Sequence, residues 1–253
     1  MAGSCSPATP SDSGAESWRG QMGLILEGLV EAWRLLTTGD GDIYGITART
    51  AVITGSSTFV ALVIGLPVGL TLALARFPGQ RGLVALANAG TGTPPVVAGM
   101  LVAILLWRSG PLGGLGLIYT PAAIVVAQAL IATPIIVAIT AAAVMALPPT
   151  LHLQIRSMGA NQRQYLWLIA REARLPLLVA VMAGFGAVVS EVGASMMVGG
   201  NLSGETRVLT TAAVLEVSKG NFGAALALGF ILLAFIVVIA VLLTTVQQRA
   251  RRR

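Results

Sequence analysis

Four long stretches without a charged residue constrain the fold of this chain more than any other feature. They cover residues 50–75, 82–107, 109–151 and 220–248. Each exceeds the roughly 20 residues that a helix needs to cross the hydrocarbon core of a membrane. Only 10% of the 253 residues are charged, whereas soluble domains carry about 25%. The sequence therefore predicts an integral membrane protein and nearly excludes a cytosolic enzyme.

Turn signals divide these stretches into five expected crossings. The stretch 109–151 is too long for one span, and its glycine-rich segment 110–116 and Pro148-Pro149 indicate a loop and a stop. The expected spans are residues 47–75, 82–107, 121–147, 176–198 and 222–246. We therefore predict an all-α fold, a polytopic membrane helical bundle with a transmembrane domain over residues 47–246.

The basic residues indicate the orientation of this bundle rather than nucleic-acid binding. Ten of the 16 lie between or after the spans, at Arg76 and Arg81, in the loop 148–174 and in the tail 247–253. Short loops rich in Lys and Arg stay in the cytoplasm. The N-terminus is thus expected outside and the C-terminus inside, with residues 247–253 as a basic cytoplasmic tail. The single cysteine excludes a disulfide framework.

Two segments precede the first span. Residues 1–20 are rich in Ser, Gly, Ala and Pro and predict a disordered tail. In residues 21–38, apolar residues recur at helical spacing, and Glu27, Glu31 and Arg34 share the opposite face. This pattern predicts an amphipathic helix that lies in the membrane interface, in contact with lipid. The alternative is a helix packed on a soluble cap. The interface is favoured, because the sequence offers no other soluble segment on which this helix could pack.

The loop 148–174 is expected to form two short helices broken at Gly159. Thr150 suits the cap of the first helix, and Asn161 the cap of the second, with Gln164 completing a box-like pattern. Glycine at the break fits a left-handed turn. One interpretation is an ordinary structured loop, with His152 a solvated surface residue. The other is a rigid unit whose exposed Arg156, Arg163, Tyr165 and Trp167 dock on a partner.

A family resemblance supports the docking interpretation. The stretch Arg156-Ser-Met-Gly-Ala-Asn-Gln-Arg-Gln-Tyr165, followed by Arg174-Leu-Pro-Leu-Leu178, resembles the cytoplasmic signature loop of ATP-binding-cassette (ABC) importer permeases. The usual Glu-Ala-Ala opening is replaced by Leu153-Gln-Ile155, and Pro176 lies about one helical turn farther from Gly159 than usual. The resemblance implies a separate ABC ATPase subunit that binds ATP and Mg²⁺, and no cofactor in this chain. It implies as ATPase-coupling residues Arg156, Ser157, Met158, Gly159, Ala160, Asn161 and Arg163.

Further stretches are similar to one branch of that family, the oxyanion importer permeases. They are Thr93-Pro-Pro-Val-Val-Ala-Gly99 with Arg108-Ser-Gly-Pro-Leu-Gly113, and Glu191-Val-Gly-Ala-Ser-Met-Met-Val-Gly-Gly-Asn201. Residues 206–222 resemble the tungstate-type permeases more than the molybdate-type. The resemblance implies tungstate as cargo, with molybdate or sulfate as alternatives. It also implies a homodimer in a bacterial or archaeal cell membrane and an extracytoplasmic oxyanion-binding protein.

Several residues are candidates for the translocation path or its gate. Pro94 and Pro95 interrupt the second span in mid-membrane, which is tolerated where protein or a water-filled cavity satisfies the freed backbone groups; a simple kink is the alternative. Glu191, in the fourth span, is expected to pack or gate, partnered by Ser190, Ser195 or a basic group, or else to be a purely structural glutamate. The path or gate candidates are Thr93, Pro94, Pro95, Ser190, Glu191, Gly193 and Ser195. For the outer loops, Arg207 and Lys219 are expected to contact the binding protein.

The sequence carries no catalytic or metal-binding motif, which favours a transport subunit without enzymatic activity. Two other classes stay open at this point. One is an intramembrane enzyme that uses Glu191 with a hydroxyl such as Ser190, although a second catalytic group is missing. The other is a proton-coupled carrier that uses Glu191, although carriers are often built from inverted repeats, and five unequal spans do not divide into halves.

Overall fold

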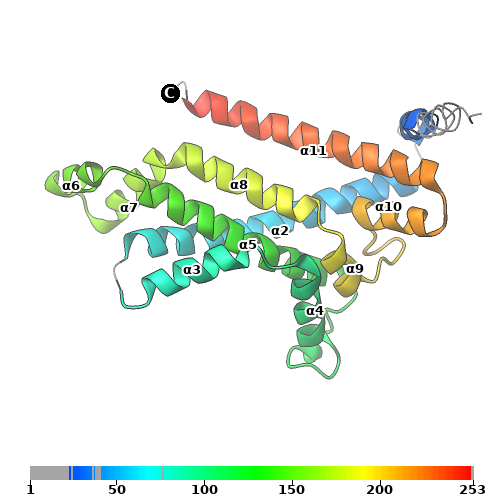
Figure 1. Ribbon diagram of the computed structural model, residues 1–253, viewed down its shortest axis with the longest axis horizontal. Helices are drawn as coiled ribbons and strands as arrows, with labels where there is room; N and C mark the ends of the chain where they lie inside the picture. The colour runs from blue at the N-terminus through cyan, green and yellow to red at the C-terminus, as the bar shows by residue number, and fades with distance from the viewer. Residues whose placement is uncertain (1–22, 24, 36, 38–40, 76, 252–253) are drawn as a thin grey trace, which may run out of the picture.

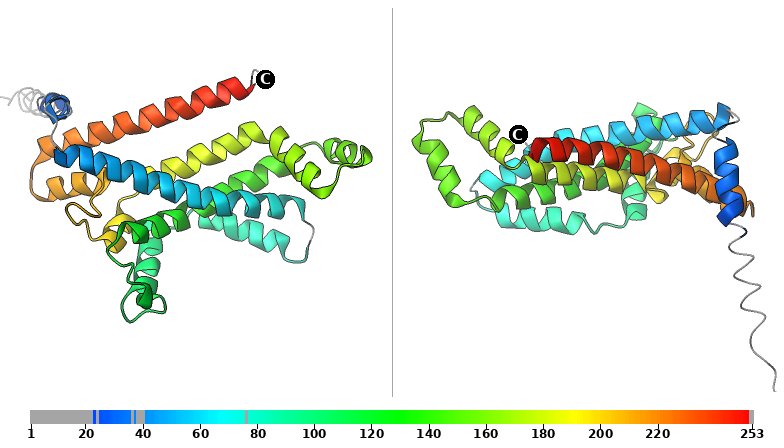
Figure 2. Two further views of the ribbon diagram at one scale, coloured as in Figure 1. Left: turned by 180° about the vertical axis from the view of Figure 1, so that it is seen from behind. Right: turned by 90° about the horizontal axis from the view of Figure 1, so that it is seen from above.

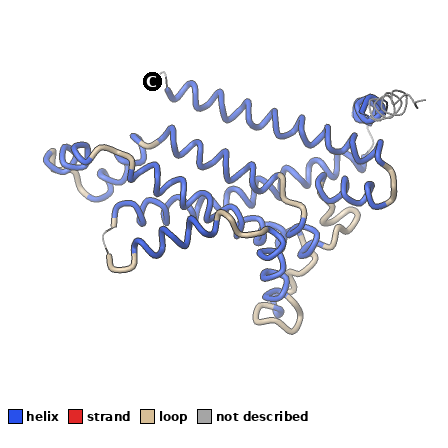
Figure 3. Tube along the Cα trace, viewed as in Figure 1, coloured by secondary structure: helices blue, strands red, loops and turns tan. Residues whose placement is uncertain are grey.

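The structure is a computed structural model that describes residues 23, 25–35, 37, 41–75 and 77–251. The described chain is helical throughout, with short connections and no strand (Figure 3). The predicted tail 1–20 lies outside the described residues, as do Arg76 and residues 252–253. The elements are α2 (Gly41–Leu74), α3 (Gln80–Gly90), α4 (Pro95–Leu106), the short 3₁₀ helix η1 (Gly113–Leu115), α5 (Pro121–Met145), α6 (Pro149–Ser157), α7 (Gln162–Glu172), α8 (Arg174–Val189), α9 (Gly193–Gly199), α10 (Leu209–Ser218) and α11 (Phe222–Arg251).

The long helices α2, α5, α8 and α11 run side by side along the length of the molecule (Figure 1). Helices α6 and α7 lie at one end of this bundle, and α10 lies at the other end (Figures 1 and 2). Helix α4 projects sideways from the middle of the bundle as an arm (Figure 1). The expectation of an all-helical bundle is confirmed. Helix α11 continues to Arg251, through most of the segment expected as a basic tail.

The spans differ from the expected five continuous helices. Three helices are long and apolar enough to cross a membrane, at Asp42–Leu74, Pro121–Met145 and Phe222–Thr245. Two bent pairs, α3 with α4 and α7 with α8, raise the number to five if each pair is one span. The bends are 104° and 71°.

Two of the predicted spans are broken, and local chemistry explains each break. The span expected over residues 82–107 ends at Gly90 and restarts at Pro95, because a proline disfavours helical geometry in the residue before it. Pro94 itself is extended, with φ −60° and ψ 127°. The span expected over residues 176–198 ends at Val189 and restarts as α9 at Gly193, where the Glu191 side chain rather than a backbone carbonyl accepts from the N–H of Ala194.

Small residues hold α2 against α5 and α8. Ala61, Ala132, Ile136 and Val188 are buried together at this contact. A Cβ atom added to Gly69 would lie 2.6 Å from the Cβ of Thr140, so the two helices approach as closely as only glycine permits. Close approach through small residues is the usual basis of helix association in lipid, where no hydrophobic driving force acts between helices.

The N-terminal helical segment lies across the end of the bundle that carries α10 (Figure 2). Its face with Gly28 and Ala32 packs on α11, where a Cβ added to Gly28 would lie 2.6 Å from the Cβ of Leu226. The apolar side chains of a second face are 44–72% exposed: Ile25, Leu26, Leu29, Val30 and Trp33. Burial at the membrane interface stays a prediction, and this uncovered apolar face supports it.

The α2–α5 contact gives a first prediction. Gly69→Ala should destabilise the protein by about 1–3 kcal/mol, because the added methyl group overlaps Thr140 and the carbonyl oxygen of Val137. Thermal unfolding in detergent measures the change. The matched control is Gly55→Ala on the same helix, where an added Cβ meets nothing within 4 Å. Equal melting temperatures for the two variants would contradict the close α2–α5 contact.

Candidate functional site

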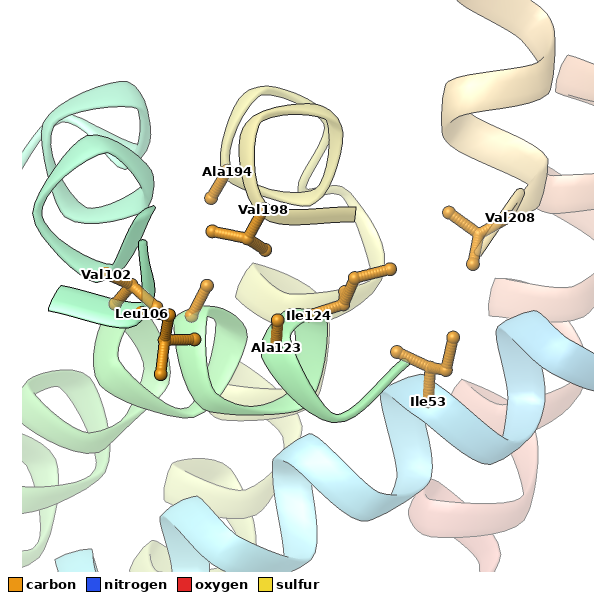
Figure 4. Packing of buried hydrophobic residues seen from close by; sticks show 9 residues of the cluster. Ile53, Val102, Leu106, Ala123, Ile124, Ala194, Val198 and Val208 are labelled. Carbon is orange, nitrogen blue, oxygen red and sulfur yellow. The ribbon is translucent and has the colours of Figure 1, made fainter. Parts of the chain in front are cut away.

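The short helix α9 lies where the α4 arm meets the bundle. Ala194 and Val198 of α9 are buried against Val102 and Leu106 of α4 and Ile124 of α5 (Figure 4). A Cβ added to Gly99 of α4 would lie 2.5 Å from the Cα of Ala194. The sequence candidates Ser190, Glu191, Gly193 and Ser195 all lie in or directly before α9. The structure thus places four of the path or gate candidates at one joint.

Glu191 caps this helix. Its side chain is buried, and its Oε1 accepts a hydrogen bond from the backbone N–H of Ala194 at 2.7 Å. The backbone carbonyl of Glu191 accepts a bond from the hydroxyl of Thr210 at 3.2 Å. The expected partners Ser190 and Ser195 are wrong, because Ser190 donates to the carbonyl of Gly186 in its own helix and Ser195 bonds elsewhere. A carboxylate at a helix N-terminus is stabilised by the free N–H groups and by the helix dipole.

Ser195 belongs to a buried polar chain that sequence reasoning missed. Ser195 Oγ accepts from Gln128 Nε2 at 3.1 Å, and Gln128 Oε1 accepts from Ser57 Oγ at 2.7 Å. The three residues come from α9, α5 and α2, and each is at most 3% exposed. The available signal was an amide side chain in the middle of the uncharged stretch 121–147, since a buried polar group needs partners.

The other end of α9 is fixed as well. The Thr206 hydroxyl donates to the carbonyl of Gly199 at 2.6 Å, and the N–H of Tyr119 donates to the carbonyl of Val198 at 2.8 Å. Gly200 ends the helix with a φ of +69°, a left-handed conformation that favours glycine. Side chains, and at this end also the backbone N–H of Tyr119, therefore bind backbone groups that are freed at the two ends of the helix.

The corner Thr93-Pro94-Pro95 separates α3 from α4 and is exposed on this chain. The hydroxyl of Thr91 donates to the carbonyl of Asn88 at 2.6 Å, at the end of α3. Beyond the corner, α4 leaves apolar side chains uncovered. Those between 40% and 58% exposed on α4 are Val96, Val97, Met100, Leu101, Ile104 and Leu105.

The predicted break in the loop 148–174 is confirmed. Helices α6 and α7 are separated at Gly159, whose φ is +74°. Asn161 and Gln164 form the expected capping box, with both bonds at 2.9 Å. The expected cap at Thr150 is wrong, because α6 begins at Pro149 with Pro148 in the cap position, so that proline fixes the first turn instead of a hydroxyl.

Most of the expected coupling residues lie on the surface of this helix pair. Met158 is 85% exposed, and Arg156, Ser157, Gly159, Asn161 and Arg163 are exposed, while Ala160 is half-buried. Trp167 is also exposed, as expected. The pair thus presents an exposed corner beyond the end of the bundle (Figure 1).

Tyr165 does not belong to that exposed surface, so the expectation of an exposed side chain is wrong. It is 5% exposed and packs with Val144, Ile155 and Ile169. Its hydroxyl lies 2.9 Å from Nδ1 of His152, which is half-buried rather than a solvated surface residue. The guanidinium of Arg156 lies 5.1 Å from the centre of the Tyr165 ring. Tyr165 therefore links α6 to α7.

The candidate outer cations are engaged within the chain. Lys219 pairs with Glu216, with Nζ 2.7 Å from Oε1. Hydrogen bonds from Lys219 and then Asn221 hold the pKa of Glu216 below its usual value. Arg207 is half-buried and donates to the carbonyl of Asn201 at 3.3 Å, while Arg49 donates to the carbonyl of Gly204 at 2.6 Å. The sequence did not single out Arg49, whose partner lies far along the chain.

The described part of the chain holds no group of three or more His, Cys, Asp or Glu residues that would suit a metal ion. Comparison with known proteins decides the family. Residues 65–252 match the family described as "Binding-protein-dependent transport system inner membrane component". The chain belongs to this permease family. It is an integral membrane protein of the multi-pass type found in bacterial and archaeal cell membranes.

Individual members of the permease family are similar over most of their length. The "Tungstate uptake system permease protein TupB" of Peptoclostridium acidaminophilum is 34% identical over 84% of this chain and 93% of its own length. The "Probable anion ABC transporter permease protein" of Haloferax volcanii is 35% identical over 77% and 86%. A solved inward-facing structure of the MetNI methionine ABC transporter has the same fold, with a TM-score of 0.60 at 23% identity over 83% of this chain and 94% of that chain.

The Glu191 cap gives a second prediction. Glu191→Gln should keep the melting temperature within a few degrees, because an amide oxygen can accept the same bond from Ala194. Glu191→Leu should destabilise by about 1–3 kcal/mol, since it leaves a buried N–H without a partner. Unfolding in detergent compares the two variants. If Gln is as damaging as Leu, the hydrogen bond to Ala194 does not explain the role of Glu191, and capping through this bond is wrong.

Proposed function

We propose that the chain is the membrane-spanning subunit of an ATP-driven ABC importer for an oxyanion. The favoured cargo is tungstate. The observation that carries the proposal is the α6–α7 pair, which presents an exposed corner at Gly159 beyond the end of the bundle. The tungstate assignment is supported by the similarity to a permease named for tungstate uptake. Molybdate and sulfate are the alternative cargoes.

Coupling to ATP hydrolysis is assigned to the α6–α7 pair. A separate ABC ATPase subunit would bind the exposed corner, and ATP and Mg²⁺ would lie on that subunit. Two features make the pair suitable for transmitting motion. The capping box fixes the start of α7, and the buried Tyr165 links α6 to α7 through His152. A push on the corner would therefore move both helices together, and α8, which follows α7 after a bend of 71°, with them.

The α4 arm supports a homodimer. One face of α4 is buried against α9 and α5, but the apolar side chains of its other face are left uncovered by this chain. A second copy packed along this arm would cover them and would place the Thr93-Pro94-Pro95 corner and α9 beside a shared path. The path or gate roles of Thr93, Pro94, Pro95, Ser190, Glu191, Gly193 and Ser195 are part of this proposal.

The carboxylate of Glu191 separates the importer from the two other functional classes. A proton-coupled carrier or an intramembrane enzyme would require Glu191 to exchange protons. In the structure this side chain caps α9 instead. Transport by the Glu191→Gln variant at the normal rate would therefore support the importer, and complete loss of transport with normal folding would support the carrier.

Co-expression with a candidate ABC ATPase tests the proposed function directly. The ATPase should co-purify with the permease, and the mass of the complex in nanodiscs should correspond to two copies of each subunit. Proteoliposomes that contain this complex and an oxyanion-binding protein should take up tungstate only with ATP inside. Calorimetry of the binding protein with tungstate, molybdate and sulfate assigns the cargo. A complex with one permease copy, or uptake without ATP, would reject the proposal.

The corner at Gly159 gives a third prediction. Gly159→Val should abolish most tungstate uptake while the protein still inserts, because β-branched residues tolerate positive φ worst. Gly159→Asn should retain most uptake, since Asn adopts this conformation readily. Lack of space is not the cause, because an added Cβ meets nothing within 4 Å. Uptake and binding-protein-stimulated ATP hydrolysis are measured.

The matched control for this prediction is Gly229→Val in α11, where an added Cβ also meets nothing within 4 Å and φ is not positive. This control should transport normally. Normal stimulation and uptake by Gly159→Val would show that the α6–α7 corner is a passive connection.

The outer cations give a fourth prediction, because Arg207 and Lys219 are proposed to receive the dianion from an extracytoplasmic binding protein. Neutralising both residues to Gln should slow uptake more at low salt than at high salt, since ions screen attraction beyond about 10 Å at 0.1 M. The control is Lys219→Gln with Glu216→Gln, which removes the ion pair without changing the net charge. An unchanged salt dependence in the Arg207 and Lys219 variant would remove this role.

A further inference from the structure

The side-chain amide of Gln128 joins three helices in the interior of the bundle. Its Oε1 accepts from Ser57 on α2, and its Nε2 donates to Ser195 on α9. The Ser57 hydroxyl also lies 2.7 Å from the carbonyl of Ile53, so its single hydrogen is shared. The oxygen and the nitrogen of this amide are thus both hydrogen-bonded, and all three side chains are buried.

The position of α9 depends on such side-chain bonds. With seven residues, α9 is too short to be held by its own backbone bonds alone. Glu191 and Thr206 fix its two ends from positions close to it in the sequence. Gln128 is different, because it lies 67 residues from Ser195 and ties the middle of α9 to the long helices α5 and α2.

The α4 arm in turn depends on α9. Gly99 of α4 approaches the backbone of Ala194, and a Cβ added to Gly193 would lie 2.9 Å from Val96 Cγ2. Figure 4 shows Ala194 and Val198 of α9 facing Val102 and Leu106 of α4. With backbones this close, a shift of α9 displaces α4. The amide of Gln128 is therefore linked to the arm through one intermediate helix.

We propose that Gln128 is a positioning residue for transport, which sets the location of α9 and hence of the α4 arm beside the path. The inference rests on the proposed function for its transport readout. Interhelical hydrogen bonds in membranes are individually weak. A weak bond at a joint biases one arrangement of α9 over another while permitting both during the transport cycle. Ser57 and Ser195 act as the two fixed partners of this amide.

The test uses the full chain in complex with its ATPase, in proteoliposomes supplied with tungstate-loaded binding protein. Gln128→Met keeps the length and unbranched shape of the side chain but removes both hydrogen-bonding atoms. Tungstate uptake per folded complex should fall about 3-fold to 20-fold, the range expected for losing interhelical bonds of this kind. The concentration of loaded binding protein at half-maximal uptake should stay unchanged, because the outer loops are not altered.

Hydrogen exchange supplies a readout that does not depend on transport. In Gln128→Met and in Ser195→Ala, backbone amides of residues 193–199 should exchange faster, while those of α11 should not change. The control is Thr140→Val, also fully buried on α5, whose hydroxyl makes no hydrogen bond in the described structure. This control should leave uptake and exchange at the wild-type values. Adding Ser195→Ala to Gln128→Met should change little further, because Gln128→Met has already removed the bond to Ser195.

Normal uptake and normal exchange in Gln128→Met would overturn the proposal. If that variant does not fold, Ser195→Ala decides, and wild-type uptake and exchange in Ser195→Ala would equally overturn it. Faster exchange in 193–199 with reduced uptake supports it. Should the wild-type complex transport none of tungstate, molybdate and sulfate, the proposed function fails. The exchange comparison still shows in that case whether Gln128 positions α9.

Discussion

The need to give freed backbone groups a hydrogen-bond partner in an apolar interior governs this structure. A continuous helix meets that need by itself, but each break exposes N–H and C=O groups that lipid cannot bind. Here the breaks at both ends of α9 are matched by side chains of Glu191, Thr206 and Thr210. Thr50 of α2 does the same for the start of α10, by accepting from the N–H of Leu209 at 2.9 Å. The irregular part of the fold is possible because of these hydroxyl and carboxyl groups.

This arrangement divides the protein into a rigid part and a jointed part. Glycines such as Gly65 and Gly69 bring α2 and α5 into backbone contact, and a contact of this kind has little freedom to slide. The same kind of approach, at Gly99 and Ala194, fixes the α4 arm to α9. Helix α9 is only seven residues long, however, and its position relative to α5 and α2 depends also on side-chain hydrogen bonds. The proposed path candidates lie in the jointed part, and the proposed ATPase corner lies at the end of the rigid part. A translocation path that opens alternately to the two sides of the membrane requires motion of one part against the other.

The sequence was informative where local chemistry decides the structure. The apolar stretches gave the helical membrane fold, Pro94-Pro95 the interruption of the second span, and Gly159 with Asn161 and Gln164 the break in the loop. It failed where distant partners decide. Ser57 and Ser195 lie 71 and 67 residues from Gln128, and no periodic pattern in the sequence predicts such a pairing. Tyr165 was expected on the surface because the sequence did not reveal that α6 and α7 fold against α5.

The capping role of Glu191 also resolves an electrostatic conflict in the proposed function. A free carboxylate on the path would repel a dianion, and in a medium of low dielectric constant that repulsion is large. In the structure the side chain is buried and its Oε1 faces the backbone of Ala194. The N–H groups at the start of α9 offset part of any charge on this side chain, so the negative potential that Glu191 presents to a passing oxyanion is reduced. An acidic residue beside an anion path is therefore consistent with transport when it stabilises the helix that borders the path.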